Sequence, residues 1–165
     1  MKRVRFFHVW VALAMLVCIA TGWAQSKGID PALLAKAKAG DADAEQRIAI
    51  SYSHLGNQKE SCRWGLIAAQ SGNVEAQFIL GEMYKSGSTV CGLPKDDAQA
   101  AVWLRKAAEH GDMGAQEELA FLYDNGQGLP QDHSQADIWW RKAAEQGDAY
   151  SRTIPPARRR RRPSR

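Results

Sequence analysis

Apolar and small residues recur at the same spacing in two stretches of the chain. In residues 100–112 and again in residues 136–148 they stand at offsets of 0, 3, 4, 7 and 8. This spacing is typical of an amphipathic helix with one face turned to a core. The residues of the face are Ala100, Trp103, Leu104, Ala107 and Ala108 in the first stretch, and Ala136, Trp139, Trp140, Ala143 and Ala144 in the second. We expect the tryptophans to fill the hollows beside the small alanines.

A weaker copy of the pattern occupies residues 61–73, so the spacing between copies is 36 to 39 residues. Recurrence at such a period indicates a repeat array. In the weak copy Ser61 and Gly65 replace the Ala and Leu of residues 100–112, which predicts a looser unit.

A second pattern lies between these copies, in residues 44–52, 76–84 and 115–123. Ala, then Leu or Ile, then a small residue, then Tyr stand at the first, fifth, sixth and ninth places. The first, fifth and ninth places share one helical face, and the small residue allows a neighbouring helix to approach. The expected core positions in the two stronger copies are Leu80, Gly81, Tyr84, Leu119 and Tyr123.

Each unit therefore predicts two antiparallel helices. The first helices are expected at residues 43–54, 74–86 and 114–125, and the second at 58–71, 97–110 and 133–146. Asn57, Asp96 and Asp132 each precede a Glu or Gln by three residues, which is a capping signal for the second helices. Glycines are expected to end the preceding helices in a left-handed conformation, namely Gly40, Gly72, Gly111 and Gly147.

These residues resemble the Sel1-like repeat, a relative of the tetratricopeptide repeat. The resemblance rests on Leu80-Gly81, Tyr84, Trp103 and Lys106-Ala107-Ala108, and on the matching residues of the third copy. It implies an all-α, right-handed α-solenoid of about three stacked antiparallel helix pairs. It also implies an adaptor or scaffold role, with a protein or peptide as partner.

The expected organisation begins with a signal peptide at residues 1–24, because basic residues precede an apolar run and Gly22-Trp23-Ala24 suits a signal peptidase. A capping helix at 25–42, opened by Asp30-Pro31, is expected to precede a degenerate repeat at 43–75 and two good repeats at 76–114 and 115–150. A secreted or periplasmic protein without a membrane span after cleavage is predicted, and an uncleaved anchor is the alternative.

Charge separates the folded part from the ends. Three bases lie before residue 6 and seven between 152 and 165, which leaves 12 Lys and Arg against 18 Asp and Glu, a net charge of −6. Pro155-Pro156 rules out a further helix, so residues 151–165 are expected to be a disordered Arg-rich tail. The tail is interpreted as a solvated segment, as a site for anionic polymers, or as a shifted reading frame that ends a fragment of a longer repeat protein.

After cleavage of the signal, Cys62 and Cys91 remain. Two cysteines in an exported protein favour a disulfide, although the sequence does not give the reach between them. The resemblance includes secreted cysteine-rich relatives with bridges within a repeat, and this chain departs from that spacing.

The residues point to no catalytic chemistry. His54, His110 and His133 share no metal-ligand spacing, and no phosphate-binding loop, nucleophile elbow or HExxH motif occurs. We therefore predict no enzyme, cofactor, metal or specific nucleic-acid site. The alternative implied by the resemblance is binding or hydrolysis of β-lactams, but no Ser-x-x-Lys motif supports it.

The end of the array gives one further expectation. Without a fourth helix pair, the face with Ala136, Trp140 and Ala144 is expected to meet water. Trp140 is then a candidate for an exposed interaction edge, through which the protein associates with itself or with a partner.

Overall fold

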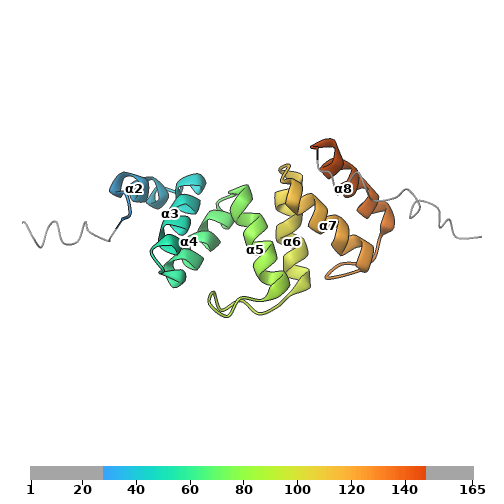
Figure 1. Ribbon diagram of the computed structural model, residues 1–165, viewed down its shortest axis with the longest axis horizontal. Helices are drawn as coiled ribbons and strands as arrows, with labels where there is room; N and C mark the ends of the chain where they lie inside the picture. The colour runs from blue at the N-terminus through green and yellow to red at the C-terminus, as the bar shows by residue number, and fades with distance from the viewer. Residues whose placement is uncertain (1–27, 148–165) are drawn as a thin grey trace, which may run out of the picture.

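The computed structural model describes residues 28–147, and these form seven helices with no strand beyond a single bridge between Ser88 and Leu93 (Figure 1). The helices are α2 (Pro31–Lys38), α3 (Ala42–His54), α4 (Gln58–Gln70), α5 (Val74–Ser86), α6 (Asp97–Glu109), α7 (Met113–Asn125) and α8 (His133–Glu145). The six longer helices agree with the predicted ranges to within one residue at each end. The expected signal peptide and Arg-rich tail lie outside the described residues.

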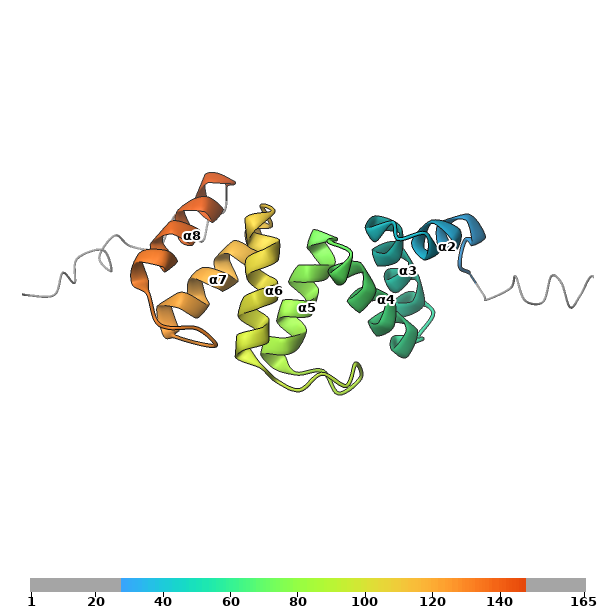
Figure 2. The ribbon, with the colours of Figure 1, turned by 180° about the vertical axis from the view of Figure 1, so that it is seen from behind.

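The helices follow one another in a single row from α2 to α8, as two opposite views show (Figures 1 and 2). Each packs mainly on its neighbours in the chain: α3 on α4, α5 on α6 and α7 on α8 within the pairs, with α4 on α5 and α6 on α7 between them. The short helix α2 covers α3 at the start of the row. This is the all-α helical repeat solenoid that the periodicity predicts.

The capping signals act as the sequence indicates. The side chains of Asn57, Asp96 and Asp132 accept hydrogen bonds from backbone N–H groups of the first turns of α4, α6 and α8, at 2.8–3.3 Å. Because the first N–H groups of a helix have no partner inside it, these bonds fix where each second helix begins. The glycines at the expected stops all have positive φ, from 88° to 103°.

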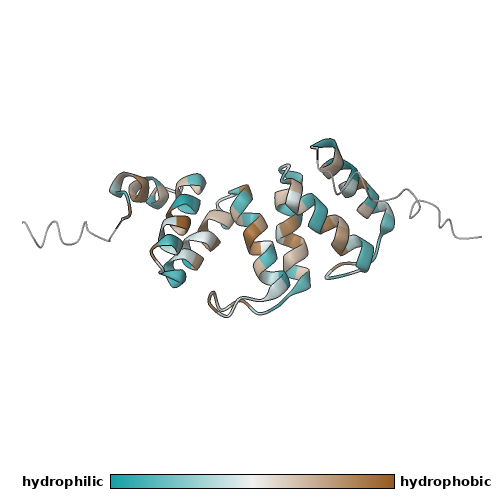
Figure 3. Cartoon of the chain, viewed as in Figure 1, coloured by the Kyte–Doolittle hydropathy of each residue, from teal (hydrophilic) through white to brown (hydrophobic). Residues whose placement is uncertain are grey.

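Three apolar clusters form the core. The largest joins α6, α7 and α8 around Leu104, Leu119 and Leu122, all fully buried. A second lies under α2, α3 and α4 around Ile48, and a third joins α4 and α5 around Leu80. Figure 3 shows hydrophobic residues in the middle of α5 and α6, and again at the tip of the loop after α5.

The predicted core positions divide into two groups. The buried ones are Leu80, Gly81, Ala100, Ala107, Ala108, Leu119, Ala136, Trp139 and Ala143. The half-buried ones are Tyr84, Trp103, Tyr123 and Ala144.

Trp103 does not fill the hollow that the sequence pattern suggests. Leu104 occupies it instead, because Gly81 leaves the space: a Cβ atom at Gly81 would lie 2.6 Å from Leu104 Cγ. Trp103 is half-buried against the third cluster, and the Lys106 ammonium lies 4.0 Å from its ring centroid. Lys142 covers Trp139 at the same distance. Each lysine therefore shields one tryptophan ring by a cation–π contact.

The expected exposed edge at Trp140 is also different in the structure. Trp140 packs against the α6–α8 cluster, and its indole N–H donates to Asp124 Oδ2 at 3.2 Å. Ala136, expected at the same open face, is completely buried. The reason is that α8 turns this face onto α7 and not towards the end of the row. The large apolar side chain that α8 exposes is Ile138, at 42%.

Candidate interaction pocket between the first two repeats

A pocket of about 410 Å³ lies between α3, α4, α5 and the loop that follows α5. Its walls are mainly aliphatic, and Ile50, Ile79 and Val90 contribute large apolar side chains that are 36–61% exposed. None of the residues that line it is charged. A concave apolar site of this size is typical of a binding pocket.

The pocket exists because α4 lacks a side chain at its centre. Gly65 occupies the position that Leu104 has in α6 and Trp140 has in α8. Opposite it stands Ala49, and a Cβ atom built on Gly65 would still be 4.0 Å from the Ala49 Cβ. The looseness predicted for the first repeat therefore takes the form of an open hollow on one side of the array.

The loop between Gly87 and Lys95 forms the outer wall, and it is held in place by several bonds. Ser88 and Leu93 exchange two backbone hydrogen bonds of 2.8 and 2.9 Å, and Asp96 N–H donates to the Tyr84 carbonyl at the base of the loop. The Ser88 hydroxyl oxygen accepts a hydrogen bond from the Cys91 N–H at the tip. The wall is therefore a shaped element of the pocket.

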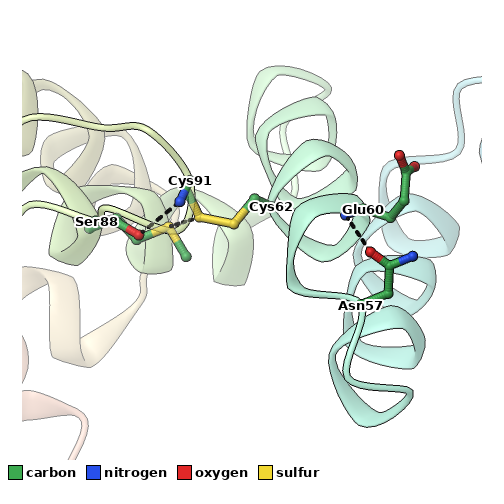
Figure 4. Close-up of a disulfide and its surroundings, with 6 residues drawn as sticks. Asn57, Glu60, Cys62, Ser88 and Cys91 are labelled. Atoms are coloured by element: carbon green, nitrogen blue, oxygen red, sulfur yellow. Dashed lines mark hydrogen bonds between the residues drawn. A yellow bond between two sulfur atoms is a disulfide. The ribbon is translucent and has the colours of Figure 1, made fainter.

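A disulfide joins the tip of this loop to α4 (Figure 4). Cys62 lies one turn into α4 and Cys91 lies in the loop, with 5.4 Å between their Cα atoms. The bridge ties the first repeat to the second, and both cysteines line the pocket. On its other side the bridge borders a second hollow, of about 650 Å³, where the charged residues Lys59 and Arg63 contribute to the lining.

Gln46 is the buried polar residue of the pocket. The residue is only 4% exposed, and its side-chain amide makes no hydrogen bond to any residue within 28–147. The other buried glutamines differ in this respect: Gln77 and Gln116 donate to the carbonyls of Ala69 and Ala108. Within the described residues, the buried side-chain atoms without a hydrogen-bond partner include Glu45 Oε2 and Gln77 Oε1. The Gln46 amide differs from these, because it borders the pocket, from which water or a bound group can reach it.

Charged groups lie further along the row. Lys85 of α5 pairs with Glu82 in the same helix and with Glu118 of α7. Burial acts to lower the pKa of Lys85, but the hydrogen bonds and charges of the two carboxylates outweigh it and raise that pKa above its usual 10.5. Lys85 is therefore a fixed cation that joins the second and third repeats.

Sequence reasoning located the two cysteines but not the pocket. Gly65 departs visibly from the repeat pattern. Gln46 does not, because the residues at the equivalent place in the other repeats, Phe78 and Glu117, differ from each other as well.

Within residues 28–147, no group of three or more His, Cys, Asp or Glu side chains is placed to hold a metal ion. No helix in that range is long and apolar enough to cross a membrane.

Solved structures similar to this chain share its helical repeats. A Sel1 repeat protein from Oxalobacter formigenes is 33% identical over 73% of this chain and 91% of its own length, with a TM-score of 0.68. A protective antigen of uropathogenic Escherichia coli with an SLR fold is 35% identical over 72% of this chain and 26% of its own, with a TM-score of 0.63.

Cysteine-rich protein B of Helicobacter pylori covers 74% of this chain and 94% of its own, with a TM-score of 0.59, but at 19% identity it shows the fold alone. No curated protein sequence matches. The sequence profile of the Sel1 repeat matches residues 74–112 and 114–148. Together with the repeat spacing, the helix pairs and the relative from Oxalobacter, this match shows that the chain belongs to the Sel1 repeat family.

Proposed function

We propose that this protein is an exported interaction module that binds a protein or peptide partner and carries out no catalysis. Sel1 repeats are interaction scaffolds as a family, and stacked helix pairs present an extended surface to a partner. The observation that carries the proposal is the open apolar pocket of about 410 Å³ between the first two repeats. A pocket lined by exposed Ile50, Ile79 and Val90 offers apolar area that a partner would cover.

Two features support export. Residues 1–24 have the charge and apolar pattern of a signal peptide, and a disulfide between Cys62 and Cys91 is stable in an oxidising compartment. Export places the module where partners belong to the cell envelope or to the surroundings of the cell. The reduced cytosol would not maintain the bridge that shapes the pocket.

The test is a cross-linking capture with tagged full-length chain, recovered from the envelope fraction of a bacterial host. We expect an N-terminus near Gln25, and we expect specific proteins to be captured by the wild type. Ile79→Asp should lose them, because Ile79 lines the pocket, whereas Val102→Asp should keep them, because Val102 is exposed on α6 away from it.

Circular dichroism of both variants checks that they remain folded. An intact Met1 on the recovered protein would contradict export. An identical set of captured proteins for the two variants, or no captured protein at all, would contradict binding through the pocket.

A further inference from the structure

The three repeats place different residues at one equivalent position, and this comparison shows what the pocket lacks. The position is Gly65 in α4, Leu104 in α6 and Trp140 in α8. Leu104 is completely buried and packs into the gap at Gly81, and Trp140 packs against the same large cluster. In the second and third repeats the array fills this place with its own apolar side chain, and in the first repeat the place is open.

The side chains at the equivalent positions of α6 and α8 indicate how large a group fits beside Gly65. They are a leucine and a tryptophan side chain, so the hollow beside Gly65 suits one aliphatic or aromatic side chain. The rest of the pocket supports this match, since Leu66, Leu80 and Met83 add apolar walls and none of the lining residues is charged. Placing a charged group there would cost its hydration without providing an opposite charge.

Gln46 indicates which group can accompany that side chain. Its amide has one acceptor and two donor groups, borders the pocket and makes no hydrogen bond to another residue within 28–147. A peptide group carries the complementary N–H and C=O. A neutral group that both donates and accepts, as a peptide bond does, matches this amide.

We propose that the pocket between the first two repeats is a subsite for one uncharged apolar side chain of a partner polypeptide, with the Gln46 amide hydrogen-bonded to a peptide group beside that side chain. The disulfide and the 87–95 loop hold the outer wall of the subsite. This proposal rests on the proposed function, and it names the partner's chemistry: a segment with an exposed Leu-like or aromatic residue and no charge at that residue.

The test uses the purified, oxidised mature chain and blocked amino acids, each of which presents one side chain between two amide groups. Binding is followed by chemical-shift changes of the backbone amides of Gln46, Gly65 and Val90. We expect N-acetyl-leucinamide and N-acetyl-phenylalaninamide to bind with Kd values of about 1 to 10 mM, as their small size allows. N-acetyl-glycinamide and N-acetyl-lysinamide should produce no saturable shifts.

Gly65→Leu should weaken binding of N-acetyl-leucinamide at least about tenfold, because a leucine fills the open place as Leu104 fills its own. Gln70→Leu is the matched control: it adds the same side chain at an exposed position of α4 outside the pocket, and it should bind as the wild type does. Equal weakening in both variants, or none in Gly65→Leu, would overturn the subsite.

The role of Gln46 is tested with methyl 4-methylpentanoate, an ester that keeps the isobutyl group of leucine and lacks both amide groups. The wild type should prefer the amide by about 3- to 10-fold, and Gln46→Leu should lose that preference. Equal binding of amide and ester by the wild type would overturn the pairing with a peptide group. If decanoate bound more tightly than N-acetyl-leucinamide and displaced it, the pocket would be a lipid site and not a peptide subsite. Binding of the blocked residues without any captured protein would leave the subsite intact and reject the proposed function.

Discussion

At the scale of single residues, an equivalent glutamine in the second and third repeats donates a side-chain hydrogen bond to the repeat before it. Gln77 Nε2 donates to the Ala69 carbonyl and Gln116 Nε2 donates to the Ala108 carbonyl, both at 3.2 Å. Each of these carbonyls also accepts the N–H of the glycine that ends the preceding helix. The glutamine at the start of one helix therefore donates to a carbonyl in the last turn of the preceding helix. Carbonyls in a last turn have no N–H donor inside their own helix, so they need partners from outside it.

The first repeat carries a variant of this arrangement. The equivalent residue is Glu45, which is 3% exposed and has an Oε2 atom that is buried without a hydrogen-bond partner. The equivalent carbonyl is that of Ala37, which accepts the Gly40 N–H as its counterparts do. A carboxylate cannot donate to that carbonyl, so the bond that joins the other repeats is missing between α2 and α3.

Glu45→Gln should therefore stabilise the protein. The amide gains the donor that Gln77 and Gln116 use, and we expect the free energy of unfolding to rise by about 1 kcal/mol at neutral pH. Denaturant unfolding of the oxidised protein measures the change. Gln77→Glu is the matched control and should reduce stability by a similar amount or more. A loss of stability in Glu45→Gln would show that the Ala37 carbonyl does not accept this hydrogen bond as the Ala69 and Ala108 carbonyls do.

At the scale of elements, the helices could be predicted from the sequence because each carries its own start and stop signals. Asp96 and Asp132 cap the second helices, and glycines such as Gly111 end them in a conformation that other residues adopt at a cost. The repeat supplied a further check, because two copies in register predict the same ends. Local signals of this kind need no knowledge of the tertiary structure.

The pocket could not be predicted in the same way, because it depends on groups that are distant in the sequence. Gly65 indicated a loose repeat, but the pocket also needs Ala49 opposite it and the loop wall in front of it. Trp103 and Trp140 show a related limit. The spacing places both on an apolar face, but Gly81 determines that Leu104 takes the central place, and the packing of α8 on α7 leaves Trp140 partly buried against the largest cluster.

The loop after α5 should depend strongly on its disulfide. The bridge closes a segment with a sequence separation of 29 residues, for which chain-entropy arguments give about 3 to 4 kcal/mol of stability. We expect the double variant Cys62→Ser/Cys91→Ser to lose this amount in denaturant unfolding at neutral pH. Each single variant should lose about as much as the double, because either substitution removes the bridge. A loss below about 1 kcal/mol would mean that the loop keeps its contacts without the bridge.

At the scale of the whole molecule, the row of helices distributes stability unevenly. Contacts run mainly between neighbours in the chain, so each part of the row is stabilised by the cluster beside it. The cluster of α6, α7 and α8 contains Leu104, Leu119 and Leu122, all fully buried, whereas the first repeat has Ile48 as its one large fully buried side chain. The first repeat also contains the open place beside Gly65 and the bridge to the second.

Native-state hydrogen exchange should reveal this gradient. Amides in the middle of α6 and α7 should open with the highest free energy, because the largest cluster must be broken to expose them. Amides of α3 and α4 should open at a lower free energy, because their cluster is smaller and α4 contains a glycine at its centre. Reduction of the disulfide should lower the opening free energy of α4 and leave that of α7 unchanged, since only neighbouring repeats are coupled. The opposite result would be equal opening free energies for α4 and α7 that decrease together on reduction. The row would then unfold as one cooperative unit, and the first repeat would not be the less stable part of the molecule.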